Sequence, residues 1–110
     1  MSYSKGEVIL FPYPFTDLST KKIRPAVVVG LTEAKYNDIF IVPLTSRTNN
    51  LGTGEHVLSG WQQAGLNVVS AVKRGCYLVD SELVLKRVGS LAKSDMDNLE
   101  KSLQTWLDLE

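Results

Sequence analysis

Arg24 and the pair Thr45-Ser46 are the residues of this 110-residue chain whose types and positions suggest chemistry. Arg24 opens the run Arg24–Leu31, whose consecutive Val residues predict a strand that is buried on both faces. Thr45 and Ser46 come directly after a second apolar run, Ile39–Leu44. If these two strands pair antiparallel, Arg24 meets the hydroxyl groups. A guanidinium beside a hydroxyl can grip a phosphate, because its fork contacts two oxygens and the hydroxyl donates a third hydrogen bond.

Such a pair could serve RNA cleavage without a metal. The 2′-hydroxyl of the substrate is then the nucleophile, and the protein stabilises the charge of the pentacoordinate phosphorane while protons move. The alternative interpretation is that Arg24 is a solvated charge at the end of a strand, which is the commoner role of an exposed Arg.

Other kinds of site have less support. One His and one Cys, without paired carboxylates at ligand spacing, give no zinc or iron set. Gly52-Thr53-Gly54 lacks the Lys and the following helix of a phosphate-binding loop. Catalysis by Cys76 or Ser46 with His56 has no specific motif behind it. Lys73 and Arg74 could lower the pKa of Cys76, but a structural cysteine is the simpler interpretation.

Length and composition predict one domain over residues 1–110. The apolar fraction of 44% and the charged fraction of 22% are typical of a globular protein. A single cysteine excludes an internal disulfide, so nothing indicates an oxidising compartment. We see no signal peptide and no apolar run of the ~20 residues that a bilayer requires, so we expect a cytoplasmic protein without membrane association.

The net charge is zero, but the charges are unevenly distributed. Residues 1–93 carry eleven Lys or Arg and seven Asp or Glu, whereas residues 94–110 carry one Lys and five acids. The basic residues form clusters that could contact phosphates or could be solvated loop charges: Lys21, Lys22 and Arg24; Arg47; Lys73 and Arg74; Lys86 and Arg87.

The elements that position these residues are expected to be short strands and one helix. Predicted strands are Val8–Phe11, Arg24–Leu31, Ile39–Leu44, Glu55–Ser59, Leu66–Val72, Tyr77–Val79 and Leu83–Gly89. Pro12–Phe15 is expected to break regular structure, and Thr16–Ile23 and Thr45–Gly54 are expected loops. We place Pro25 at the start of its strand or on an edge, because it cannot donate to a ladder.

The last segment is the predicted helix. Ser94 is the expected N-cap, with Asp97 three residues further on. An apolar stripe would cover the sheet or a partner; it comprises Met96, Leu99, Leu103, Trp106 and Leu107. Many short strands and one terminal helix predict a mainly β fold, a strongly bent sheet or small barrel with a covering helix.

Several motifs, in this order, resemble the MazF/PemK family of toxins from type II toxin–antitoxin systems. They are Gly6–Leu10, Phe11–Leu18, Arg24–Val29, Pro43–Ser46, Trp61–Leu66, Ser70–Lys73 and Val88–Leu91. The resemblance covers nearly the whole chain. It implies a small SH3-like β-barrel (PemK/CcdB-like) with a C-terminal helix, a homodimer, and sequence-specific cleavage of single-stranded RNA to a 2′,3′-cyclic phosphate and a 5′-hydroxyl, with no metal or cofactor.

The resemblance also implies roles for individual residues. Arg24 would act in proton transfer and transition-state stabilisation, and Thr45 would help to hold the phosphate. Further RNA contacts are expected from Phe15, Thr16, Lys21, Lys22, Ser46, Arg47, Lys73 and Arg74. Some relatives carry an Arg/Asp pair where this chain has Lys73, Arg74 and Gly75, so the acid is missing. Asp17 and Glu7 are the acids that we consider for the general base.

The family further implies partners. A cognate antitoxin is expected to present an acidic segment that competes for the basic groove, and operator DNA would be bound only through the antitoxin complex. Two alternatives keep the fold. One is a CcdB-like inhibitor of DNA gyrase, which acts through a C-terminal Trp, although Trp106 falls on the apolar stripe. The other is a catalytically silent, dimerising relative.

Overall fold

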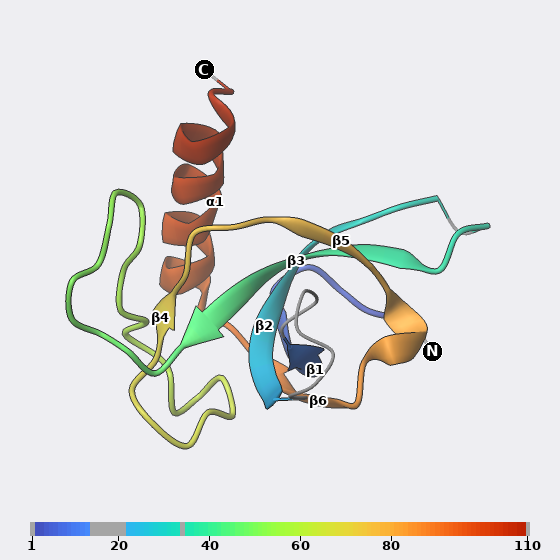
Figure 1. Cartoon of the computed structure of the whole chain (residues 1–110), viewed down its shortest axis with the longest axis horizontal. Coiled ribbons are helices and arrows are strands. Elements are labelled where there is room, and N and C mark those ends of the chain that lie inside the picture. Colours follow the sequence, from blue (N-terminus) through green and yellow to red (C-terminus); the bar gives the residue numbers. More distant parts are fainter. Residues whose placement is uncertain (1, 14–21, 34, 110) are drawn as a thin grey trace.

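A computed structural model describes residues 2–13, 22–33 and 35–109 of the chain (Figure 1). The elements, in order, are β1 (Glu7–Tyr13), β2 (Lys22–Leu31), β3 (Asp38–Thr45), β4 (Ala71–Val72), β5 (Tyr77–Asp80), the 3₁₀ turn η1 (Ser81–Leu83), β6 (Lys86–Ser90) and α1 (Lys93–Leu107). No helix in the described ranges is long and apolar enough to cross a membrane.

The strands form one antiparallel sheet in the order β4-β3-β2-β1-β6, and β5 pairs with β3. The predicted mainly β fold with a C-terminal helix is confirmed. The sheet is strongly bent, but its end strands β4 and β6 do not pair with each other in the described part of the chain, so it stops short of a closed barrel.

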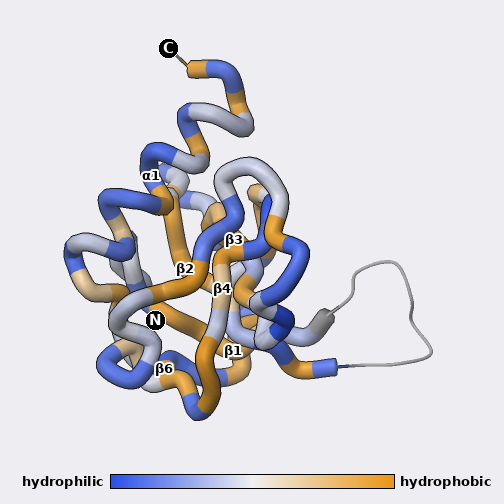
Figure 2. The backbone as a smooth tube through the Cα atoms, turned by 90° about the vertical axis from the view of Figure 1, so that its left-hand side faces the viewer, coloured by the Kyte–Doolittle hydropathy of each residue, from blue (hydrophilic) through white to orange (hydrophobic). Residues whose placement is uncertain are grey.

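The sheet is buried on both faces, as the Val run in β2 predicts. Ala26 and Val28 lie in one core cluster, while Val27, between them, lies in the other, since successive strand residues point to opposite faces. The first cluster comprises Tyr3, Ile9, Phe11, Ala26, Val28, Ile39, Ile41 and Val79. The second comprises Val8, Val27, Val42, Leu44, Leu58, Ala64, Val72 and Leu99. In Figure 2 the hydrophobic stretches accordingly gather along the central strands.

The prolines fit the sheet differently from what the sequence predicts. β1 continues through Pro12 to Tyr13, so the expected break at Pro12 is wrong; Pro12 pairs with Ile23 near the end of the β1–β2 ladder. Pro25 lies inside β2, opposite Leu10 of β1. Pairing of β2 with β3 begins only at Ala26, so Pro25 sits where that side of the strand is a local edge, which agrees with the missing N–H.

The N-cap of α1 lies two residues earlier than expected. The N-cap is Ala92, which has an extended backbone and no side-chain cap, so the prediction of Ser94 is wrong. Ser94 lies inside the first turn instead. The apolar stripe is confirmed for Leu99, which is fully buried, and for Met96, Leu103 and Trp106, which pack on the second core cluster. Leu107 is 51% exposed and lies outside this contact.

The segment between β3 and β5 is less regular than its residue types suggest. The predicted strand at 55–59 is reduced to one bridge, Val57 with Ala71, and the predicted strand at 66–72 to the two residues of β4. The turn at residues 60–65, which precedes β4, approaches β6 closely. A Cβ on Gly65 would overlap the Val88 carbonyl oxygen, and a Cβ on Gly89 would overlap that of Ala64. The backbones of the turn and of β6 are therefore in direct contact.

Candidate nucleic-acid interface

β2 and β3 bring Arg24 and Thr45 to the same end of the sheet. The two strands are antiparallel, and their ladder ends at the pair Ala26 and Pro43. Continuing this register by two residues places Arg24 opposite Thr45. The expectation that these strand ends meet is therefore confirmed by the pairing of the strands.

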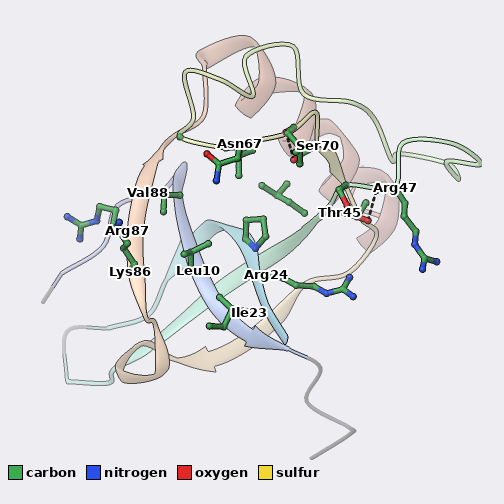
Figure 3. A pocket seen from close by; sticks show the side chains of 16 residues that line it. Leu10, Ile23, Arg24, Thr45, Arg47, Asn67, Ser70, Lys86, Arg87 and Val88 are labelled. Carbon is green, nitrogen blue, oxygen red and sulfur yellow. Dashed lines mark hydrogen bonds between the residues drawn. The ribbon is translucent and has the colours of Figure 1, made fainter. Parts of the chain in front are cut away.

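Both residues line a cavity of about 740 Å³. Its walls come from Leu10 in the middle of β1, from the adjoining ends of β2 and β3, from the segment 65–70 and from β6 (Figure 3). The lining residues are Leu10, Ile23, Arg24, Pro25, Leu44, Thr45, Ser46, Arg47, Gly65, Leu66, Asn67, Val68, Ser70, Lys86, Arg87 and Val88. The size is that of ligand-binding clefts in general.

The cavity is basic at two opposite sides. Figure 3 shows Arg24 and Arg47 extending to one side, beside Thr45, while Lys86 and Arg87 lie at the other. Within the described ranges, Arg24, Arg47 and Lys86 form no ion pair. Cations without acidic partners keep their charge available for an anionic ligand.

The Thr45 hydroxyl is held in position by the chain itself. Its oxygen accepts a hydrogen bond of 3.1 Å from the Arg47 backbone N–H. Because this bond uses an acceptor site of the oxygen, the hydroxyl proton is still available to donate to a phosphate. The same contact shapes the turn in which Arg47 leaves β3.

The sequence matches the profile of the PemK-like, MazF-like toxins of type II toxin–antitoxin systems over residues 4–107. The chain belongs to the PemK/MazF toxin family. A search of curated proteins gave no significant match.

Solved structures of this fold resemble the chain at low sequence identity. A mycobacterial endoribonuclease in complex with its cognate antitoxin has 16% identity and a TM-score of 0.76, with 99% of this chain and 98% of that chain covered. The Mycobacterium tuberculosis toxin MazF-mt6 has 18% identity and a TM-score of 0.72, with 94% and 98% covered. A MazE–MazF structure from Deinococcus radiodurans has 16% identity and a TM-score of 0.77, with 98% of both chains covered.

The PemK/MazF chain gathers only part of the predicted site around the cavity. Arg24, Thr45, Ser46 and Arg47 line it. Lys22, Lys73 and Arg74 are exposed but are not among the lining residues. The predicted contacts Phe15, Thr16 and Lys21, together with Asp17, lie outside the described residues.

Asn67, Ser70, Lys86 and Arg87 line the cavity without having been predicted as site residues. For the last two a signal existed, because Lys86-Arg87 is one of the basic clusters in the sequence. Asn67 carries no such signal, since it stands in an ordinary polar-apolar stretch. Arg87 is also occupied: its Nε lies 2.8 Å from Glu7 Oε2, its guanidinium donates to the Ser2 carbonyl oxygen, and it stacks 5.0 Å from the Tyr3 ring centre.

A buried carboxylate fixes one wall of this PemK/MazF domain to the helix. Asp95 of α1 is 1% exposed and accepts hydrogen bonds from the Ser59 N–H (2.9 Å), the Ser59 hydroxyl (3.0 Å) and the Gly60 N–H (2.8 Å). These contacts hold the start of the 60–65 turn, which leads to Asn67. Asp95 therefore positions a wall of the cavity from a distance.

The loop after Thr45 is fastened to the helix as well. Trp106 Nε1 donates to the Thr53 carbonyl oxygen at 2.8 Å, and the Ser102 hydroxyl donates to that of Gly54 at 2.7 Å. Glu55 accepts from the Gly52 N–H at 2.7 Å and from the Arg74 N–H at 2.8 Å. These two backbone hydrogen bonds, first that from Arg74, lower the pKa of Glu55. They tie the loop that follows Arg47 to the turn at Arg74.

The other reactive groups are placed less favourably for chemistry. Burial raises the pKa of the Cys76 thiol, which disfavours the nucleophilic thiolate. His56 Nδ1 lies 3.1 Å from the Gly54 carbonyl oxygen, and its Nε2 is buried without a protein partner in the described part of the chain. Among the described residues, no three His, Cys, Asp or Glu side chains are grouped so that they could hold a metal ion.

Proposed function

We propose that this PemK/MazF-family protein is a metal-independent, sequence-specific endoribonuclease that cuts single-stranded RNA. The observation that carries the proposal is the juxtaposition of Arg24 with Thr45 at one end of a cavity whose cations Arg24, Arg47 and Lys86 form no ion pair within the described ranges. RNA is polyanionic, and a cavity of this charge attracts it. Solved proteins of the same fold are described as endoribonucleases, which agrees with the proposal.

The chemistry follows from the two side chains. The 2′-oxygen of the RNA attacks the adjacent phosphorus, the bond from phosphorus to the 5′-oxygen breaks, and a 2′,3′-cyclic phosphate and a 5′-hydroxyl result. The proton of the 2′-hydroxyl passes to a base and the leaving 5′-oxygen takes up a proton. Arg24 and the Thr45 hydroxyl donate hydrogen bonds to the non-bridging oxygens, whose negative charge grows in the transition state.

Glu7 is a poor choice for the general base. Its carboxylate pairs with Arg87 at 2.8 Å and accepts from the Ser4 N–H, and it does not line the cavity. Asp17, the other acid considered from the sequence, lies outside the described residues. The resemblance to the family implies that Arg24, which lines the cavity, takes part in proton transfer. Because a guanidinium stays protonated in proteins, we place this role at the leaving 5′-oxygen and not at the base that accepts the 2′-hydroxyl proton.

Partners are proposed on the same basis. Arg47 and Ser46 would contact phosphates near the scissile bond, and the exposed Lys22, Lys73 and Arg74 would extend the RNA-binding surface. A cognate antitoxin with an acidic segment would compete with RNA for these cations, acting on a toxin homodimer in the cytoplasm. Two solved relatives are described as antitoxin complexes or as MazE–MazF, which agrees with such a partner.

The test is an RNA cleavage assay in EDTA with a long unstructured RNA. We expect the unaltered protein to cut it, and Arg24→Ala and Thr45→Ala to cut it about 10²–10³-fold more slowly. Lys101→Ala and Thr105→Ala, both exposed on α1, remove the same kinds of group far from the cavity and should cut normally. Absence of cutting by the unaltered protein contradicts the proposal. Gyrase inhibition by the same sample would then support the CcdB-like alternative.

A further inference from the structure

Figure 3 shows Leu10 between the two basic sides of the cavity, and further apolar side chains line it. Ile23 is 59% exposed and Val68 is 54% exposed, although both line the cavity. Leu10, Pro25 and Val88 complete these walls. Apolar walls that stay in contact with water gain free energy when a flat apolar group covers them. The cationic ends of the cavity can bind phosphates, and the apolar walls between them can pack against a flat apolar group.

Asn67 adds a directed polar group to this apolar region. Figure 3 shows its side chain pointing from the 65–70 segment into the cavity, toward Leu10 and Val88. Within the described ranges its amide has no hydrogen-bond partner. One amide offers a donor and an acceptor side by side, which matches the hydrogen-bonding edge of an unpaired base.

Lys86 is the cation on the side opposite Arg24 that has no ion pair among the described residues, whereas its neighbour Arg87 is held by Glu7. An apolar site with one amide between two cationic ends has the alternation of a nucleotide strand, in which each base lies between two phosphates. The arrangement favours single-stranded nucleic acid over a peptide.

We infer that the cavity holds one unpaired RNA base between Ile23 and Val68, that Asn67 hydrogen bonds to the edge of this base, and that Lys86 contacts the phosphate farther from Arg24. The inference rests on the proposed function, since it names the specificity site of the same RNA cavity. Asn67 is then a residue that determines the cut sequence at one position, and Lys86 adds affinity without sequence preference.

The choice of base can be altered in a predictable way. Asn presents one donor and one acceptor, whereas Asp presents acceptors only. Guanine is the base whose Watson–Crick edge offers two neighbouring N–H donors. Asn67→Asp should therefore shift the base preference at one position of the RNA toward guanine, and Asn67→Ala should reduce the base preference at that position.

The experiment measures binding separately from cutting. A random-sequence RNA pool in which fluorine replaces every 2′-hydroxyl lacks the attacking group, so the bound fraction can be sequenced whether or not the protein cuts RNA. We expect the unaltered protein to enrich a short sequence, and Asn67→Ala to reduce the preference at one position by about tenfold while the other positions keep theirs. Asn98→Ala, on the exposed side of α1, is the matched control.

Lys86→Ala should weaken binding of all sequences equally and reduce the slope of log affinity against log salt by about 0.7. Lys101→Ala, which removes the same charge from α1, should leave the slope unchanged. Identical enrichment by the unaltered protein and both Asn67 variants, with native circular dichroism, overturns the inference. Enrichment that depends on Asn67 in a protein that does not cut ordinary RNA supports the inference while the proposed cleavage fails.

Discussion

Polar groups are used in opposite ways on the two sides of this domain. Between α1 and the 46–60 loop they are paired: Asp95 takes three hydrogen bonds, and Trp106 donates to Thr53. At the cavity, by contrast, three of the four cations that line it have no acidic partner among the described residues. Arg24 and Lys86 are exposed and form no ion pair within the described part of the chain.

This difference separates stability from function. A buried polar group that loses its partner costs about 1–3 kcal/mol, so the helix side should be sensitive in folding assays. Exposed cations contribute little to folding, so the cavity side should be sensitive only in RNA assays. Substitutions on the helix side should therefore change stability, and substitutions at the cavity should change RNA cleavage or binding.

Arg24→Ala should have the largest effect on activity. Loss of a donor to the transition-state oxygens is expected to lower the rate of RNA cleavage by about 10²–10³-fold, as measured by single-turnover cleavage of a labelled oligonucleotide. Urea unfolding should be nearly unchanged. Arg24→Lys keeps the charge but loses the fork, and should be intermediate in rate. A marked loss of stability in Arg24→Ala would contradict the separation of stability from function.

Asp95→Ala should have the largest effect on stability. The N–H groups of Ser59 and Gly60 lose their acceptor, so the free energy of unfolding should fall by about 2–4 kcal/mol in urea titrations. Asp97→Ala is the control and should stay within about 0.5 kcal/mol, because Asp97 makes, among the described residues, only an exposed ion pair with Lys93 on the same helix. Equal effects of the two substitutions would contradict the structural role of Asp95.

Trp106→Phe tests the attachment of the loop. It removes the hydrogen bond to the Thr53 carbonyl oxygen and should lower the free energy of unfolding by about 1 kcal/mol. Amide hydrogen exchange in residues 46–54 should speed up more than elsewhere. Trp61→Phe is the matched control, since Trp61 packs on the same core cluster but forms no such bond within the part of the chain that the structure describes. Exchange that rises equally in both variants would exclude the attachment.

Glu55 should have the smallest effect, and one that depends on pH. Its pKa in the folded protein is lowered, so its contribution to stability is complete above the ordinary value of 4.5 and is lost as pH falls through the folded pKa. Glu55→Gln should therefore flatten the loss of stability below about pH 4.5, by about 1 kcal/mol or less. Urea unfolding between pH 7 and pH 3 measures this, with Glu82→Gln as the exposed control.

The sequence predicts the regular half of the molecule well. The Val run of β2 and the apolar run of β3 fix two strands, and their pairing brings Arg24 to Thr45. Residues 55–72 were predicted less well, because their shape depends on Asp95 and on the contact with β6, which no local period records. Asn67 and Lys86 become neighbours of one cavity only when the sheet bends, so their roles could not be predicted from residue types.

The contact of Gly65 with β6 has a consequence for how this domain can vary. The opening between the 65–70 segment and β6 is set where two backbones touch at Gly65 and Gly89, not by the side chains that line it. The width of the opening is therefore determined by different residues from those that determine which ligand is selected. Side chains at positions 23, 67 and 68 can be exchanged to suit another ligand while the width of the opening stays constant.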